Sequence, residues 1–180
     1  MKKVCVLVLI SIVLIVGCDS MMNTPTKRVE EFLNKYQRQD EEVIRQLRDS
    51  TKMIDTDLDG DNYIEYTNVM KRQYKDLTYT IKEEMIDGEN ATVTVEIEVY
   101  DYKSGLKDAE EYYTTHSEDF KTDNKVDNNK YIAYKLSKLK DAKDRIKYTL
   151  NLTLSRKDKK WVMNNITDTD RQKIHGLYNN

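Results

Sequence analysis

The sequence is poor in the residues that carry much enzyme chemistry and in those that shape tight turns. Its 180 residues include two cysteines, two histidines, one proline, five glycines and one tryptophan. So few thiols and imidazoles provide no cluster spaced for zinc, and no glycine-rich phosphate loop or nucleophile elbow occurs. Thirty basic residues nearly balance 32 acidic ones, so no basic face predicts a nucleic-acid partner.

Long apolar runs are also scarce, and the clearest one lies at the start. The uncharged run Val4–Val16 follows Lys2 and Lys3 and ends in Ile15-Val16-Gly17-Cys18. It is shorter than the ~20 residues of a spanning helix and is typical of a secretory signal. Its end resembles a bacterial lipobox, in which a small residue precedes the cysteine that receives the lipid. We therefore expect residues 1–17 to be a lipoprotein signal peptide and Cys18 to carry a diacylglyceryl group and an acyl chain such as palmitate.

This interpretation explains the use of cysteine. Cys5 would leave with the signal, so the mature chain would keep one thiol and form no internal disulfide. Two long acyl chains anchor a protein far more firmly than one. We expect a lipid-anchored protein facing the extracellular side of the cell membrane, and the Lys, Asn, Ile and Tyr usage favours a low-GC Gram-positive source. Residues 18–26 would form the tether, and residues 27–180 a single domain.

The apolar spacing predicts an α+β domain. Residues 26–48 carry one apolar stripe, with hydroxyls and a proline at the start and a bend expected near Gln39-Asp40. A second helix is expected over 62–75, helical spacing recurs from 106 to 120, a polar loop covers 121–129, and another helix covers 129–143. A short last helix would carry Ile174 and Leu177, with Asp168 or Asp170 as its cap.

Strict alternation of apolar and polar residues predicts the strands. Residues 77–81 and 91–99 form a hairpin with one buried face, and 146–154 form a third strand. A three-residue loop, Asp87-Gly88-Glu89, would place Ile81 opposite Val95 and keep the apolar faces together. A fourth strand is expected over 161–166, and its facing is not defined by the pattern. The sheet therefore has about four antiparallel strands, packed by N-terminal helices, with a helical insertion between the second and third strands.

This order of elements resembles the cystatin-like cone fold of the nuclear transport factor 2-like superfamily, which includes ketosteroid isomerase and many small bacterial lipoproteins. The resemblance rests on "TPTKRVEEFLNKY", on "YKDLTYTIKEEMIDGENATVTVEIEVYDY" and on the last hairpin into "KKWVMNNIT". The helical pair at 104–143 departs from that pattern and leaves the strand order open. Members of the superfamily range from isomerases to inert binding modules, so the resemblance implies a fold and chooses no function.

Residues 55–66, "DTDLDGDNYIEY", resemble the first half of an EF-hand loop. Asp55, Asp57, Asp59 and Gly60 match its early positions, but Tyr66 stands where the bidentate glutamate belongs. The alternative is an acidic connector whose carboxylates cap the next helix. No metal site is predicted, and weak calcium binding through these three aspartates remains a second alternative for the function.

Catalytic candidates are few. His116 falls on an apolar helix stripe, and Glu83 is the one carboxylate whose position in the alternation points into the sheet's inner face. Tyr79 and Tyr148 lie on that same face. Together they would serve a small-molecule enzyme of the isomerase or cyclase kind, with a cavity between helices and sheet. The otherwise apolar face favours packing, so a non-catalytic binding or accessory module of the bacterial cell envelope, with an unknown ligand and no cofactor, is the preferred interpretation.

The outward face of the sheet is the candidate surface for a second copy or a protein partner. It is predicted to carry short polar side chains that no helix is patterned to cover, although such a face can equally be solvated. Its members are Thr78, Thr80, Lys82, Thr92, Thr94, Glu96, Glu98, Tyr100, Lys147, Thr149, Asn151, Thr153 and Ser155.

Overall fold

The computed structural model describes residues 23–54, 58 and 60–179, and its first half is helical. Helix α3 (Pro25–Gln37) begins where expected, because the Thr24 hydroxyl accepts a hydrogen bond from the Lys27 amide and proline occupies the first turn. The predicted bend is a complete break, at which Gln39 has a φ of 57°. Three short segments follow: α4 (Glu41–Arg45), α5 (Leu47–Ser50) and the 3-10 helix η1 (Thr51–Met53). Helix α6 (Gly60–Asp76) then leads to the sheet.

The sheet has four antiparallel strands in the order β1-β2-β5-β6. They are β1 (Thr78–Asp87), β2 (Asn90–Tyr100), β5 (Arg145–Lys157) and β6 (Lys160–Met163). A helical insertion between β2 and β5 consists of α7 (Tyr102–Thr115), η2 (Ser117–Phe120), a small hairpin of β3 (Lys121–Thr122) and β4 (Lys125–Val126), and α8 (Asn128–Asp141). The chain ends with α9 (Asp168–Ile174). The predicted α+β class, the four strands and the insertion are confirmed.

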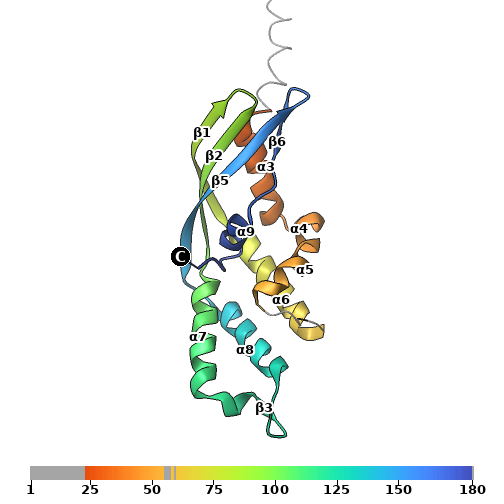
Figure 1. The fold of residues 1–180 in the computed structure, drawn as a ribbon, viewed down its shortest axis with the longest axis vertical. Helices are drawn as coiled ribbons and strands as arrows, with labels where there is room; N and C mark the ends of the chain where they lie inside the picture. Colours follow the sequence, from red (N-terminus) through yellow and green to blue (C-terminus); the bar gives the residue numbers. More distant parts are fainter. Residues whose placement is uncertain (1–22, 55–57, 59, 180) are drawn as a thin grey trace, which may run out of the picture.

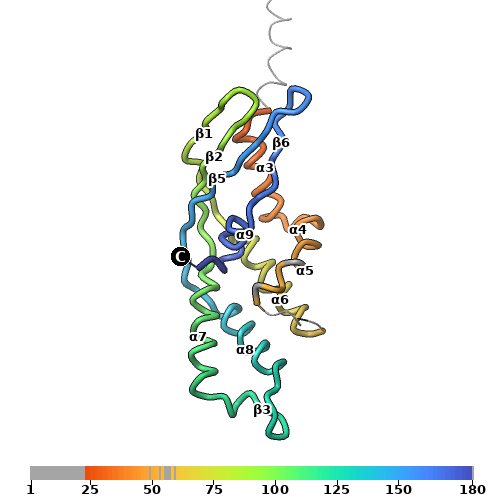
Figure 2. The backbone as a smooth tube through the Cα atoms, in the orientation of Figure 1, coloured from red at the N-terminus to blue at the C-terminus, as the bar shows by residue number. Residues whose placement is uncertain are grey.

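The helices lie on one side of the sheet, and the insertion extends beyond its end (Figure 1). The chain enters beside the turns of the two sheet hairpins, whereas α7, α8 and the β3–β4 hairpin form the opposite tip (Figure 2). An aromatic cluster joins α7 to α8 at this tip. Phe120 is buried there and its ring meets Tyr112, Tyr113, Tyr131 and Tyr134 at centroid distances of 5.3–6.1 Å.

The first hairpin differs from the prediction at its turn. Ile81 pairs with Val95 as expected, but Asp87 pairs with Asn90, so the loop has two residues, Gly88 and Glu89. A bulge at Lys82 reconciles the short loop with the matched apolar faces, because one extra residue shifts the register by one. Beyond the bulge, every side chain of β1 therefore points to the face opposite to the one that simple alternation predicts.

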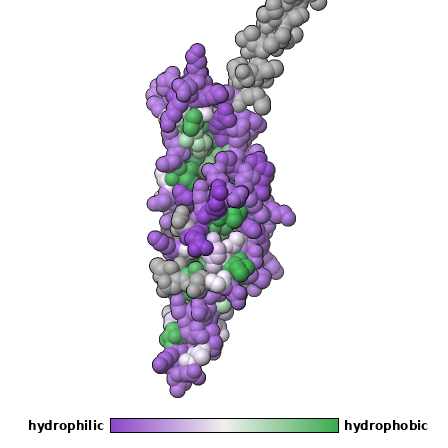
Figure 3. Space-filling view, turned by 90° about the vertical axis from the view of Figure 1, so that its right-hand side faces the viewer, coloured by the Kyte–Doolittle hydropathy of each residue, from purple (hydrophilic) through white to green (hydrophobic). Residues whose placement is uncertain are grey.

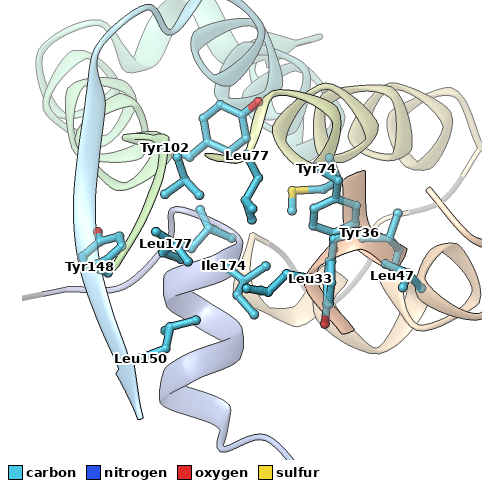
Figure 4. Packing of buried hydrophobic residues seen from close by; sticks show 14 of the residues in the cluster. Leu33, Tyr36, Leu47, Tyr74, Leu77, Tyr102, Tyr148, Leu150, Ile174 and Leu177 are labelled. Atoms are coloured by element: carbon cyan, nitrogen blue, oxygen red, sulfur yellow. The ribbon is translucent and has the colours of Figure 1, made fainter. Parts of the chain in front are cut away.

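The core lies between the inner face of the sheet and the helices. The predicted alternation is confirmed on the two central strands, where these inward side chains are at most 2% exposed: Val93, Val95, Ile97, Val99, Leu150, Leu152 and Leu154. Helix α9 fills the middle of the layer, with Ile174 and the following Leu177 between β5 on one side and α3 on the other (Figure 4). Its cap is Thr167, whose hydroxyl oxygen accepts from the Asp170 amide, and not the expected Asp168 or Asp170.

A buried amide joins α6 to the point where β2 leaves the sheet. Gln73 is fully buried; its Oε1 accepts from the Tyr100 amide at 2.8 Å, and its Nε2 donates to the Tyr100 carbonyl at 3.1 Å. Gly176 lies against this junction with a φ of 69°, and its carbonyl accepts from the Lys103 amide. A Cβ at position 176 would overlap the Tyr100 carbonyl oxygen and the Gln73 Nε2. Glycine is therefore required there for space as well as for conformation.

A buried histidine follows α9. The Nε2 of His175 lies 2.8 Å from the Tyr74 hydroxyl, while its Nδ1 is buried and has no hydrogen-bond partner in the described part of the chain. Burial lowers the pKa of His175 from 6.5 to about 3, and the charge of Arg171 acts in the same direction. Burial also raises the pKa of Tyr74 well above its usual value, so the pair is neutral at physiological pH.

Gly176→Ala should destabilise the protein by about 3 kcal/mol or more, because it adds overpacking to a left-handed backbone. Gly88→Ala is the matched control: Gly88 also has a positive φ, of 58°, but a Cβ there meets nothing within 4 Å. We expect that control to cost only about 1–2 kcal/mol. Urea unfolding of the two variants measures the difference, and equal losses would contradict the packing role of Gly176.

Acid should destabilise the fold through His175. The unfolded chain binds the proton below pH 6.5, whereas the folded ring resists it to about pH 3. Stability from this group is therefore complete above pH 6.5 and falls by about 1.4 kcal/mol per pH unit as the pH drops through that window. His175→Gln should flatten the pH dependence of the unfolding free energy by that slope. Parallel curves for the parent and His175→Gln would refute this assignment.

Candidate functional site

The four predicted catalytic candidates do not converge. Tyr79 on β1 donates its hydroxyl to Asn34 Oδ1 of α3, and Tyr148 on β5 donates to the Tyr178 carbonyl. The expectation for Glu83 is wrong: the Lys82 bulge pairs it with Thr94, on the outward face, where it is exposed. The alternation of residues along β1 placed Glu83 on the inner face only because the prediction treated β1 as a strand without a bulge.

The predicted position of His116 on the apolar face of a helix is also wrong. Helix α7 ends at Thr115, so His116 is its C-cap and is exposed at the tip of the insertion. Its ring stacks on Tyr112 with centroids 4.1 Å apart, and its Nδ1 lies 2.8 Å from the Thr115 hydroxyl. The tip lies at the far end of the molecule from the sheet hairpins (Figure 1). His116 therefore shares no cavity with the three sheet residues.

Several predictions fall where they meet no structural test. Asp55, Asp57 and Asp59 of the calcium-like loop lie outside the described residues, as does Cys18. The neighbouring Glu65 forms an ion pair with Lys140 at 2.9 Å. Within residues 23–54, 58 and 60–179, no group of three or more acidic, histidine or cysteine side chains is arranged to hold a metal ion.

The two hairpins share one sheet, and the outward face is open to solvent over most of its length. Its polar side chains pair across the strands: Thr94 donates to Asn151, and Glu96 receives both Lys82 and Lys147 at 3.3 Å. Tyr100 departs from the predicted surface. Its ring is packed against the guanidinium groups of Arg72 and Arg145, and its hydroxyl donates to Asp76.

The largest hollow described lies elsewhere, between α3 and the edge strand β6. This α3–β6 groove has a volume of about 790 Å³ and is open to solvent. It is lined by Arg28, Glu31, Phe32, Lys35, Tyr36, Glu42, Gln46, residues 160–166 and Arg171. On this side of the molecule, apolar side chains form separate patches along its length, including one in the upper part, and each is bordered by polar side chains (Figure 3).

Aromatic rings form the apolar part of the groove. Register with β5 turns Trp161, the only tryptophan of the chain, toward α3 and leaves it 5% exposed. Phe32 meets Tyr36 edge-on at 5.3 Å, and Tyr36 meets Tyr74 at 5.0 Å, so the rings continue into the core. Burial raises the pKa of Tyr36 to about 12, although the charge of Arg171 acts in the opposite direction. The Tyr36 hydroxyl is therefore neutral at physiological pH.

Two arginines line the same groove, and they differ in how they are paired. Arg28 forms an ion pair with Glu31 through Nη1 at 2.7 Å and donates through Nη2 to Asn23 Oδ1 at 3.5 Å, while its Nε is buried with no hydrogen-bond partner among the described residues. Arg171 of α9 is half-buried, and its guanidinium forms no hydrogen bond or ion pair with any residue the structure describes. Lys35, by contrast, is held by Glu42 at 2.8 Å. The half-buried guanidinium of Arg171 lines the groove, and a carboxylate or phosphate is its best partner.

The groove can therefore bind a ligand that combines an apolar part with an anionic group. Its lining contains no serine, threonine, cysteine, histidine or aspartate, and its two glutamates are ion-paired. Sequence reasoning missed this site, because its walls come from two segments, residues 28–46 and 160–171, that are far apart in the sequence. The single tryptophan, on a strand whose facing was undefined, was the only signal.

No family model, curated protein or solved structure matches the chain in comparisons with known proteins. The resemblance to the nuclear transport factor 2-like superfamily therefore stays a prediction. No helix in the described part of the chain combines the length and apolar character needed to cross a bilayer.

Proposed function

We propose that this protein is a lipid-anchored, extracytoplasmic binding or accessory protein of the bacterial cell envelope, and that the α3–β6 groove is its ligand site. The observation that carries the site is the half-buried guanidinium of Arg171, which forms no hydrogen bond or ion pair with the described residues, beside an aromatic floor. A pocket with apolar walls and a few converging polar groups is the usual form of a small-molecule or peptide site. The ligand class this chemistry supports is an anion with an apolar body.

The position of Asn23 supports the anchoring part of the proposal. Its side chain donates to the Lys159 carbonyl, at the turn of the second sheet hairpin. A lipid on Cys18 would be five residues away, which is at most about 18 Å of extended chain. The hairpin turns would then face the membrane, the α7–α8 tip would point away from it, and the groove would lie near the membrane side.

Cys18→Ser should abolish lipid attachment and leave the precursor unprocessed or release the protein from the membrane, since the thiol is the proposed attachment atom. Fractionation of cells followed by mass spectrometry of the N-terminus measures both effects. Cys5→Ser is the control, because Cys5 would be removed with the signal. Normal cleavage and unchanged membrane retention of Cys18→Ser would refute the lipoprotein assignment.

The groove can be tested with anilinonaphthalene sulfonate, an anionic aromatic probe. Binding should change the fluorescence of Trp161, the only tryptophan, because that residue lines the groove. Arg171→Gln should weaken binding by about tenfold or more, since a hydrogen bond to a charged group contributes about 1.5–3 kcal/mol. Lys107→Gln removes an equal charge from an exposed site on α7 and should leave the affinity unchanged. Equal affinities for the parent and Arg171→Gln would refute the proposed site.

A further inference from the structure

The free edge of β6 lies along the groove. Arg156–Trp161 and Leu154–Met163 are alternate pairs of the β5–β6 ladder, and the Trp161 amide points away from β5, because it donates to Asn23. Hydrogen-bonding direction repeats every second residue in an antiparallel pair. The Met163 amide therefore also points away from β5, toward the groove. The pairing with β5 continues on the other side, where the Asn164 amide donates to the Thr153 carbonyl.

Asn23 already occupies the first half of this edge. Its Oδ1 accepts from the Trp161 amide at 3.1 Å and its Nδ2 donates to the Lys159 carbonyl at 3.1 Å. The Lys159 carbonyl and the Trp161 amide are two residues apart. In a parallel pair, one residue of the added strand hydrogen-bonds to two groups with this spacing. The side-chain amide of Asn23 thus takes the place of a peptide group. The next such groups, the Trp161 carbonyl and the Met163 amide, have no partner among the residues the structure describes.

We propose that the α3–β6 groove binds an extended acidic peptide segment, which adds to β6 as a fifth strand of the sheet. The inference rests on the proposed function of the groove and specifies its ligand. Main-chain hydrogen bonds to Trp161 and Met163 hold the backbone, as in other cases of strand addition at a sheet edge. Alternate side chains of the peptide face the aromatic floor, and its carboxylate pairs with the guanidinium of Arg171.

The charges favour an acidic peptide over a second copy of this chain. Pairing of two β6 edges would bring Lys160 and Arg171 of one copy toward the same cationic groups of the other. The strand is also only four residues long, so self-pairing would gain few hydrogen bonds. A peptide carboxylate supplies the missing acceptor, and charge-assisted bonds to arginine are the strongest such contacts.

The test uses a synthetic six-residue peptide that alternates valine with threonine and ends in a free aspartate, titrated against Trp161 fluorescence. Two derivatives carry N-methyl groups, one on the first, third and fifth residues and the other on the second, fourth and sixth. Successive amides of a strand point to opposite edges, so only one derivative blocks pairing with β6. We expect one derivative to lose at least tenfold in affinity and the other to keep most of it.

The protein side of the test compares Met163→Pro with Met163→Ala. Proline removes the amide that faces the groove and leaves the pairing with β5 intact, whereas alanine removes only the side chain. Met163→Pro should abolish peptide binding while Met163→Ala retains it, and the thermal unfolding of each variant shows whether it is folded. If proline prevents folding, the two methylated peptides still decide the question with the parent protein.

If both methylated peptides keep the affinity of the parent peptide, or if both lose it equally, strand addition is overturned. Binding of the sulfonate probe that still depends on Arg171 would then leave the groove as a site for another anion, so the two proposals fail separately. Concentration-dependent dimerisation in sedimentation, abolished by Met163→Pro, would assign the edge to a second copy and overturn the peptide proposal.

Discussion

The structure depends on the buried amide of Gln73, which satisfies both main-chain groups of Tyr100 where β2 leaves the sheet. At that point the ladder partners run out, and a buried amide or carbonyl without a partner costs a substantial part of a domain's stability. Glutamine has a donor and an acceptor on one planar group, so a single side chain from α6 replaces the missing strand. The same junction receives Gly176, and it therefore fixes the sheet, the helical insertion and the C-terminal segment relative to one another.

This junction also fixes the position of one wall of the groove. Helix α9 ends against it, carries Ile174 into the core and presents Arg171 to the groove. The rings of Phe32, Tyr36 and Tyr74 connect the groove to His175 without a gap. Because these contacts lie in a packed core, the helix that carries Arg171 is held in place before any ligand arrives. Preorganisation of this kind lowers the entropic cost of binding.

Local patterns predicted what depends on local physics. Alternation along β2 and β5 placed the inner face correctly. When one face is buried, only one register keeps all the apolar side chains on that face. The same reasoning misplaced Glu83, because the two-residue turn at Gly88 and the matched apolar faces are both satisfied only if Lys82 bulges. His116 followed an apolar stripe whose helix ended one residue earlier. The groove could not be predicted, because it requires α3 to lie beside β6, and no local pattern specifies that contact.

The edge of β6 is open beside Arg171, and proteins usually protect such an edge. Edge strands are usually shortened, charged or covered, because they invite pairing with other chains. In this chain β6 is short, Lys160 stands at its start, and Asn23 covers the amide of Trp161. These devices protect one half of the edge and leave the half at Met163 open, next to Arg171. Asn23 also lies between the proposed anchor and α3. In the proposed lipoprotein, the residue that blocks part of the edge would therefore also orient the groove toward the membrane.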